Sequence, residues 1–165
     1  MINVAEQLAR AVSLREAGSL DDARAVLLHL SSAVPDDVQV AYQTAWVHDL
    51  LGLEREAVPF YVRALDGDGL SAVERRGAML GLGSTYRSLG MYSEAVGVLA
   101  YGVAEFPDDR ALAVFLAMAR YNAGEAKEAV AGLLTVLIDT ADDPEIQRYR
   151  RAITFYAEDL DRVWS

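Results

Sequence analysis

Small and apolar residues recur along this chain in an arrangement that is repeated four times. An alanine that follows an acidic residue returns at intervals of 34, 38 and 34 residues. A glycine stands five positions before each alanine, and a bulky apolar residue stands four positions after it. The alanines are Ala23, Ala57, Ala95 and Ala129, the glycines Gly18, Gly52, Gly90 and Gly124, and the bulky residues Leu27, Tyr61, Leu99 and Leu133. Three features recurring together at one period indicate a repeat architecture.

Each period predicts a pair of antiparallel helices. The glycine ends the first helix because it adopts a left-handed backbone conformation at little cost. The acidic residue lies in the first turn of the second helix, at the positive end of the macrodipole. The alanine lets the two backbones approach, and the bulky residue fills the space between repeats. We therefore predict an all-α solenoid with helix pairs at about 4–37, 38–71, 76–109 and 110–143.

Two local signals refine this prediction. The 38-residue interval contains Ser71-Ala72-Val73-Glu74, which has the pattern of a capping box, so the helix that follows is expected to be about one turn longer. Asp143-Pro144-Glu145 has the pattern of a helix start, and apolar residues continue at helical spacing as far as Val163. A ninth helix, at about 144–163, is thus expected to cap the array with a polar outer face. The whole chain, 1–165, is predicted to form one domain.

Composition narrows the classes of partner. The 165 residues carry a formal net charge of -10, and a surface this acidic repels a phosphate backbone, so we expect no nucleic-acid partner. The absence of cysteine excludes disulfides and thiolate chemistry. No apolar stretch is long enough to span a membrane, and the first residues lack the pattern of a secretory signal. We expect no membrane partner and a cytoplasmic location.

The third repeat carries a specific family resemblance. Leu82-Gly83-x-x-Tyr86, followed by Gly90, Ala95, Leu99 and Pro107, resembles the tetratricopeptide pattern, and the other repeats keep parts of it over about residues 4–142. The chain is also similar to small stand-alone bacterial tetratricopeptide proteins, in the stretches Ala45-Trp46-Val47-His48-Asp49, Gly81-Leu82-Gly83-Ser84-Thr85-Tyr86-Arg87 and Tyr149-Arg150-Arg151-Ala152-Ile153. This resemblance implies a superhelical solenoid that binds a protein or peptide along a concave surface formed by the first helix of each pair.

The repeat register identifies the side chains expected on that concave surface. Aromatic residues, methionine and arginine dominate binding hot spots, and several lie in this register. The predicted partner-binding residues are Tyr42, Trp46, Asp49, Ser84, Arg87, Met118, Tyr121 and Asn122, and Arg15 and Leu80 share their register. In an alternative interpretation, the last helix folds back over this surface and makes part of it core.

Catalytic and metal-binding patterns are weak. His48 stands where the repeat usually has a tyrosine packed between helices, so a structural role is favoured over a catalytic one. Adjacent helical residues point about 100° apart, so His48 and Asp49 are poorly placed to serve one centre. Ser84 lacks the Gly-x-Ser-x-Gly turn of a nucleophile, and two histidines without cysteine predict no metal site. We expect no enzyme activity and no cofactor.

Two hypotheses of function follow. The first is an adaptor that binds a peptide segment or another protein on its concave face. The second is a self-associating structural protein, for instance a homodimer, without a separate peptide ligand. In that alternative the exposed edge of the first repeat, or the apolar side of the last helix, pairs with a second copy, since repeat arrays need capped ends and the first repeat has no obvious cap.

Overall fold

The computed structural model describes residues 3–164, and this part of the chain forms ten α-helices and no strand. Met1, Ile2 and Ser165, which the predicted domain includes, lie outside the described residues. The helices are α1 (Val4–Glu16), α2 (Leu20–Ala33), α3 (Val38–Leu50), α4 (Glu54–Asp66), α5 (Ala72–Ser88), α6 (Tyr92–Glu105), α7 (Arg110–Asn122), α8 (Ala126–Thr140), α9 (Pro144–Arg148) and α10 (Arg150–Glu158).

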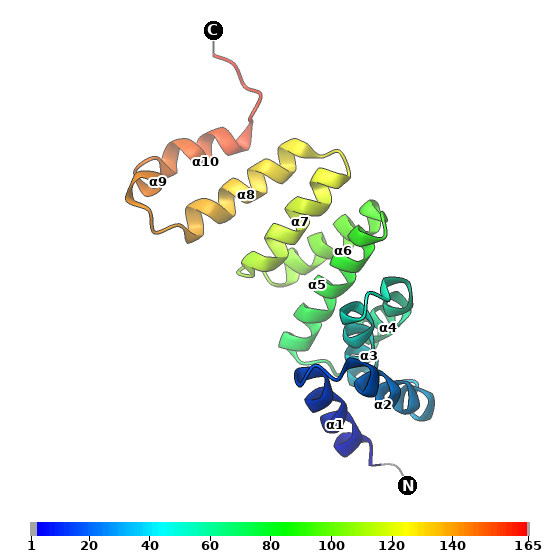
Figure 1. Ribbon diagram of the computed structural model, residues 1–165. Helices are drawn as coiled ribbons and strands as arrows, with labels where there is room; N and C mark the ends of the chain where they lie inside the picture. The colour runs from blue at the N-terminus through cyan, green and yellow to red at the C-terminus, as the bar shows by residue number, and fades with distance from the viewer. Residues whose placement is uncertain (1–2, 165) are drawn as a thin grey trace.

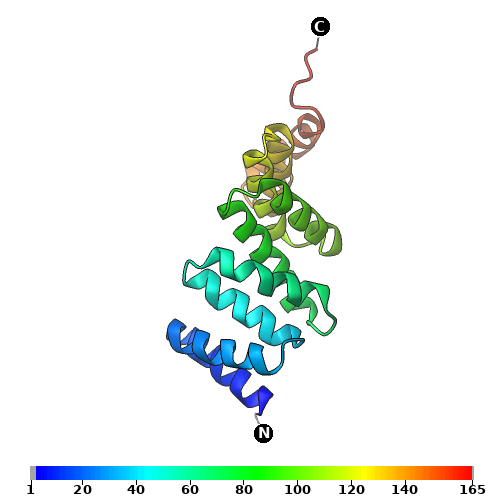
Figure 2. The same cartoon turned by 90° about the vertical axis from the view of Figure 1, so that its right-hand side faces the viewer.

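The first eight helices form four pairs, and each pair packs against the next. Figures 1 and 2 show the pairs stacked along one direction, with the two ends of the chain at opposite ends of an elongated molecule. The turn inside each pair contains a glycine whose φ lies between 71° and 86°, a left-handed conformation that favours glycine. The predicted all-α solenoid of helix pairs is confirmed.

The capping box at the start of α5 is also confirmed. The Ser71 hydroxyl accepts a hydrogen bond from the Glu74 backbone N–H at 3.3 Å, and the Glu74 carboxylate accepts one from the Ser71 backbone N–H at 2.8 Å. The helix that this box starts has 17 residues, whereas α1, α3 and α7 each have 13. The four additional residues make α5 about one turn longer, as the interval of 38 predicts.

The repeated alanines and three of the four bulky residues are buried in the array. The alanines are 0 to 3% exposed, and Leu27, Tyr61 and Leu99 are 2% exposed or less. Leu133, at the same place in the fourth repeat, is 43% exposed, so the prediction that it fills the space between repeats is wrong. The reason is the helix that follows. Each of α3, α5 and α7 packs against both helices of the preceding pair, whereas α10 packs chiefly against α8.

The predicted C-terminal helix is divided and shorter than expected. It turns at Tyr149, where φ is -96° and ψ is 6°, and it ends at Glu158. The carbonyl of Ile138, near the end of α8, accepts hydrogen bonds from the Gln147 amide and the Arg150 guanidinium, both at 2.9 Å. These two side chains flank the turn and hold it against α8.

The concave side of the array is not covered by this last segment. α9 and α10 extend the stack beyond α8 and do not lie across α1, α3 or α5 (Figure 1). The alternative in which the last helix covers the concave surface is therefore wrong. Within residues 3–164, every helix is too short or too polar to cross a membrane.

Candidate functional site

A groove with a volume of about 530 Å³ lies between α3 and α5, two of the first helices of the pairs. Four of the predicted partner-binding residues line it: Tyr42, Trp46, Asp49 and Ser84. Of the other ten lining residues, six come from α5, two from α3, and one each from α4 and α7. These other residues are Gln43, Leu50, Tyr61, Val73, Glu74, Arg76, Gly77, Leu80, Gly81 and Phe115.

The floor of the groove is a row of aromatic rings held against α5. The centroids of the Trp46 and Tyr42 rings are 5.7 Å apart, and those of Tyr42 and Tyr61 are 6.5 Å apart. Gly77 faces the hydroxyl end of Tyr42, and Gly81 faces that of Tyr61, so closely that a β-carbon at either glycine would collide with the ring. The two glycines, one helical turn apart, thus make room for the two tyrosines.

Asp49 places a carboxylate among these rings. The Thr85 hydroxyl of α5 lies 2.8 and 2.9 Å from its two oxygens, within donating distance, although the same hydroxyl also reaches the Gly81 carbonyl at 2.8 Å. Burial raises the pKa of Asp49, and hydrogen bonding from Tyr61 and Thr85 opposes that rise. Burial and the neighbouring Asp49 carboxylate raise the pKa of Tyr61 as well. Within the described residues, Asp49 forms no ion pair.

The cationic side chains beside the groove already have partners. The Arg15 guanidinium lies 3.6 Å from the centroid of the Trp46 ring and forms an ion pair with Glu16 at 3.5 Å. Its side chain is only 9% exposed. The Arg76 guanidinium donates to the carboxylate of Asp109, the N-cap residue of α7, at 2.6 Å. The carboxylate of the groove therefore contacts only neutral groups. The cationic groups beside the groove already have partners.

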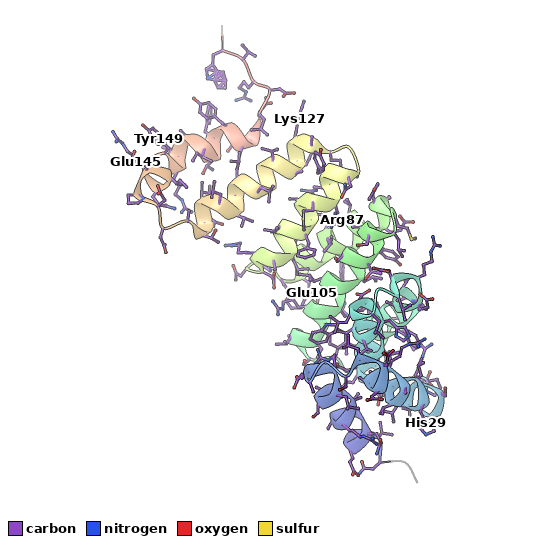
Figure 3. The ribbon with its side chains drawn as sticks, viewed as in Figure 1. His29, Arg87, Glu105, Lys127, Glu145 and Tyr149 are labelled. Atoms are coloured by element: carbon purple, nitrogen blue, oxygen red, sulfur yellow. The ribbon has the colours of Figure 1, made fainter. Side chains whose placement is uncertain are left out.

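The remaining predicted residues lie further along the array, outside this groove. The Arg87 guanidinium donates to the Asn122 side-chain oxygen at 3.3 Å, which joins α5 to α7. Figure 3 shows Arg87 where these two helices meet. Met118 is half-buried and Tyr121 is 70% exposed, both on α7. The structure thus places the eight predicted residues in two groups, four in the groove and four between and along α5 and α7.

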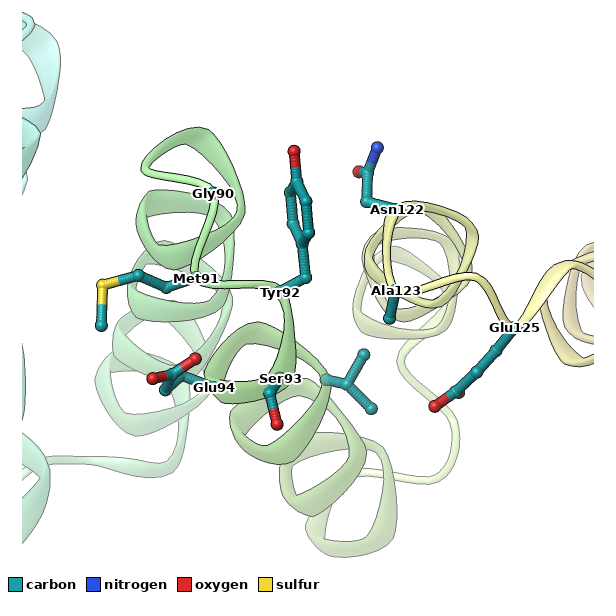
Figure 4. A pocket seen from close by; sticks show the side chains of 9 residues that line it. Gly90, Met91, Tyr92, Ser93, Glu94, Asn122, Ala123 and Glu125 are labelled. Atoms are coloured by element: carbon teal, nitrogen blue, oxygen red, sulfur yellow. The ribbon is translucent and has the colours of Figure 1, made fainter.

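A larger hollow, of about 650 Å³, is a weaker candidate. It lies between the start of α6 and the turn from α7 to α8, where Tyr92 and Asn122 stand side by side (Figure 4). None of the residues that line it is buried, and most are exposed. Binding sites rely on side chains that the fold has already desolvated and fixed, so this hollow lacks what the groove has.

His48 has the structural role that the sequence predicts. It is 2% exposed, and its ring stacks on Phe60 with centroids 5.3 Å apart. Its Nδ1 lies 2.7 Å from the Thr44 carbonyl oxygen, and its Nε2 accepts from the Arg24 guanidinium at 3.2 Å. Both ring nitrogens therefore have hydrogen-bond partners of their own. Across residues 3–164, no three histidine, aspartate or glutamate side chains gather as metal ligands would.

Sequence reasoning missed the groove residues whose role depends on helix register. Tyr61 was expected only as a spacer between repeats, and neither its hydroxyl nor that of Thr85 was connected with Asp49. Gly77 and Gly81 carried a signal, because two glycines one turn apart inside a helix cost stability unless something packs closely there. The sequence alone does not say that the packed groups are Tyr42 and Tyr61.

The family comparison agrees with this geometry. Residues 38–160 match the family described as Tetratrico peptide repeat, and the chain belongs to that family. Its fold supports a protein-interaction or scaffold role. The search of curated proteins gives no match.

Solved structures of MamA share the fold. MamA from residue 41 to its end, from Desulfovibrio magneticus RS-1, has a TM-score of 0.74 at 17% identity, over 96% of this chain and 88% of that one. MamA AMB-1 has a TM-score of 0.74 at 18% identity, over 89% of this chain and 79% of that one. Another MamA crystal structure has a TM-score of 0.73 at 18% identity, over 99% of this chain and 80% of that one. At these identities the likeness establishes the fold alone.

Proposed function

We propose that this protein is an adaptor whose α3–α5 groove binds a segment of a partner protein that presents a lysine or arginine. The observation that carries this proposal is Asp49. Its carboxylate is half-buried, opens to the groove and contacts only neutral hydroxyl groups. A bound cation would supply the charged partner that the fold itself does not provide.

The chemistry of the groove suits such a segment. A hydrogen bond to a charged group contributes about 1.5–3 kcal/mol, and more of this is realised where water is partly excluded. Trp46 and Leu80 offer apolar surface beside Asp49 for the neighbouring side chains of the segment. The net charge of -10 attracts a basic partner over a longer range and speeds its association.

The groove is also rigid enough to bind without a large ordering cost. Tyr42 and Tyr61 are 7% and 2% exposed, and their rings are fixed against Gly77 and Gly81. Preorganised side chains lose little conformational entropy on binding. We propose that a longer segment continues along the same side of the array, past Ser84 towards the group formed by Arg87, Met118, Tyr121 and Asn122.

A capture experiment with two matched variants tests the adaptor role. Ser84→Arg places a bulky cation in the groove, whereas His29→Arg makes the same change in charge at an exposed residue of α2, well away from Arg87 and α5 (Figure 3). We expect wild type and His29→Arg to capture the same protein from a host lysate and Ser84→Arg to lose it. Equal capture by all three, with the helical content unchanged, would exclude the groove.

Self-association is the second candidate function, and a different surface favours it. The C-terminal end carries three large aromatic side chains that are each about half exposed: Phe155, Tyr156 and Trp164. Exposed apolar surface of this kind is typical of protein interfaces. The bacterial source, the cytoplasmic location and the absence of catalysis stay predictions.

A further inference from the structure

The C-terminal end of the array is incompletely closed. Leu133 is 43% exposed, whereas its counterparts in the three earlier repeats are 0 to 2% exposed. Val130 and Leu137 of the same helix are also exposed, at 45% and 42%. No residue of α9 or α10 is buried. This end therefore presents more uncovered apolar surface than any junction between the earlier repeats.

Aromatic side chains on α10 and just beyond its end are also uncovered. The Phe155 ring lies 5.8 Å from that of Tyr156 and 5.7 Å from that of Trp164, measured between centroids. The three side chains are 45 to 56% exposed, and Tyr149, at the outer end of the molecule in Figure 3, is 55% exposed. Rings that contact one another and remain half open to water give a second surface a place to pack.

Basic residues gather before Phe155 and acidic residues after it, apart from Glu145 and Arg162, which pair with Arg148 and Asp159. Three arginines precede Phe155, and three acidic residues follow it: Arg148, Arg150, Arg151, Glu158, Asp159 and Asp161. Arg150 pairs with Asp139, and Asp161 pairs with Lys127. Arg151 and Glu158 have no ion pair or side-chain hydrogen bond within the described residues. Both lie on the face of α10 that carries Phe155, because they are four and three residues away from it.

We propose that this face of α10 binds a second copy of the chain in a two-fold symmetric dimer. If two α10 helices pair antiparallel about Phe155, each Phe155 packs on its counterpart, and Arg151 of each copy meets Glu158 of the other. The contact is self-complementary because each copy supplies both charges. A parallel pairing would place like charges together and is disfavoured.

The opposite end of the array does not offer a matching surface for head-to-tail growth. Val40 and Val47 of α3 are 1% and 0% exposed, and Val47 packs on the preceding helix pair. The residues at these places in α1 are Glu6 and Ser13, and both are exposed. A polar face at the N-terminal end leaves the C-terminal contact to close on itself, so the assembly stops at two copies.

Sedimentation of the full chain, from micromolar to millimolar protein, tests this dimer. The inference rests on self-association as the second candidate function and does not involve the groove. We expect wild type to dimerise, and Arg151→Glu and Glu158→Arg each to raise the dissociation constant by about tenfold or more, since each turns two attractive pairs into repulsive ones. Arg151→Glu/Glu158→Arg restores both pairs and should dimerise again.

Mixing the two single variants gives the sharpest control, because each is repelled by its own copy and matched to the other. We expect a heterodimer from the mixture, while Arg10→Glu, an exposed change on α1, leaves dimerisation unchanged. A dimer whose dissociation constant is unchanged by Arg151→Glu and Glu158→Arg would contradict this interface but still support self-association. A strictly monomeric wild type would overturn both, and capture of a different protein through α10 by that monomer would assign the face to another partner.

Discussion

Asp49 and Thr85 face each other across the junction between α3 and α5, with the threonine hydroxyl 2.8 Å from the nearer carboxylate oxygen. Thr85 is 2% exposed, so the carboxylate is fixed against the buried side of α5 while its other side meets the groove. A charged group in this position lowers the stability of the fold, whereas an apolar side chain at the same place would not. That cost is understandable if the carboxylate serves recognition, and it can be measured.

Asp49→Asn should stabilise the protein at neutral pH. Burial raises the pKa of Asp49, so the folded state binds its proton more tightly than the unfolded chain does. This contribution to stability is present below the ordinary pKa of 3.8 and is lost as the pH rises through the raised value. Urea unfolding should therefore show a higher free energy of unfolding for Asp49→Asn than for wild type at neutral pH, and this difference should shrink towards pH 3.8. The control Asp36→Asn, at an exposed residue, should change the free energy of unfolding little.

Gly81→Ala should destabilise the protein, although alanine favours helices. The added methyl group would collide with the Tyr61 ring, and overpacking of this kind costs about 1–3 kcal/mol against a gain in helix propensity of about 1 kcal/mol. Gly97→Ala is the matched control, because nothing lies within 4 Å of that site in α6. The midpoint temperature of thermal unfolding should fall for Gly81→Ala and rise for Gly97→Ala. A higher midpoint for both variants would mean that the Tyr61 ring moves aside at little energetic cost.

Arg15→Ala should cost about 1–2 kcal/mol, because it removes a largely buried cation–π contact and the packing of the side-chain stem. Arg10→Ala, at an exposed site of the same helix, should stay within about 0.5 kcal/mol of wild type. Trp164→Phe leaves Trp46 as the only tryptophan, so its fluorescence reports on the contact. Identical emission spectra with and without Arg15 would argue against the stacking.

Ser71→Ala should lower the free energy of unfolding by about 1 kcal/mol, because it removes half of the capping box at the start of α5. Ser19 occupies the corresponding position of α2 but makes no capping hydrogen bond, so Ser19→Ala should have a much smaller effect. Equal losses in chemical denaturation would show that the box contributes nothing beyond an ordinary N-cap.

The sequence predicts those features that local chemistry determines. The left-handed glycines, the capping box and the extra turn of α5 each depend on a few neighbouring residues, and each is confirmed. The exposure of Leu133 was not predictable from the period, because burial at that place depends on where the next helix packs. The turn at Tyr149 depends on contacts with Ile138, which a helical pattern in the sequence does not reveal.

The sequence predicts the groove only in part, because some of its features follow from the repeat and others depend on tertiary packing. Tyr42, Trp46, Asp49 and Ser84 share a helical register, so the repeat alone places them on one side of the array. The contacts of Asp49 with Thr85 and Tyr61 depend on how α3, α4 and α5 align, and that alignment comes from tertiary packing. The sequence pattern therefore predicts the position of the groove but not the contacts of Asp49 that give the groove its chemical character.

The most direct test of the groove's specificity is selection of binding peptides from a random displayed library on the wild-type protein. Affinities of the selected peptides are then measured for wild type, Asp49→Asn and His29→Arg by fluorescence anisotropy. The account predicts peptides with a lysine or arginine beside an apolar residue, weakened by about tenfold for Asp49→Asn and unchanged for His29→Arg. Peptides without a basic residue, or with equal affinity for Asp49→Asn, would contradict it.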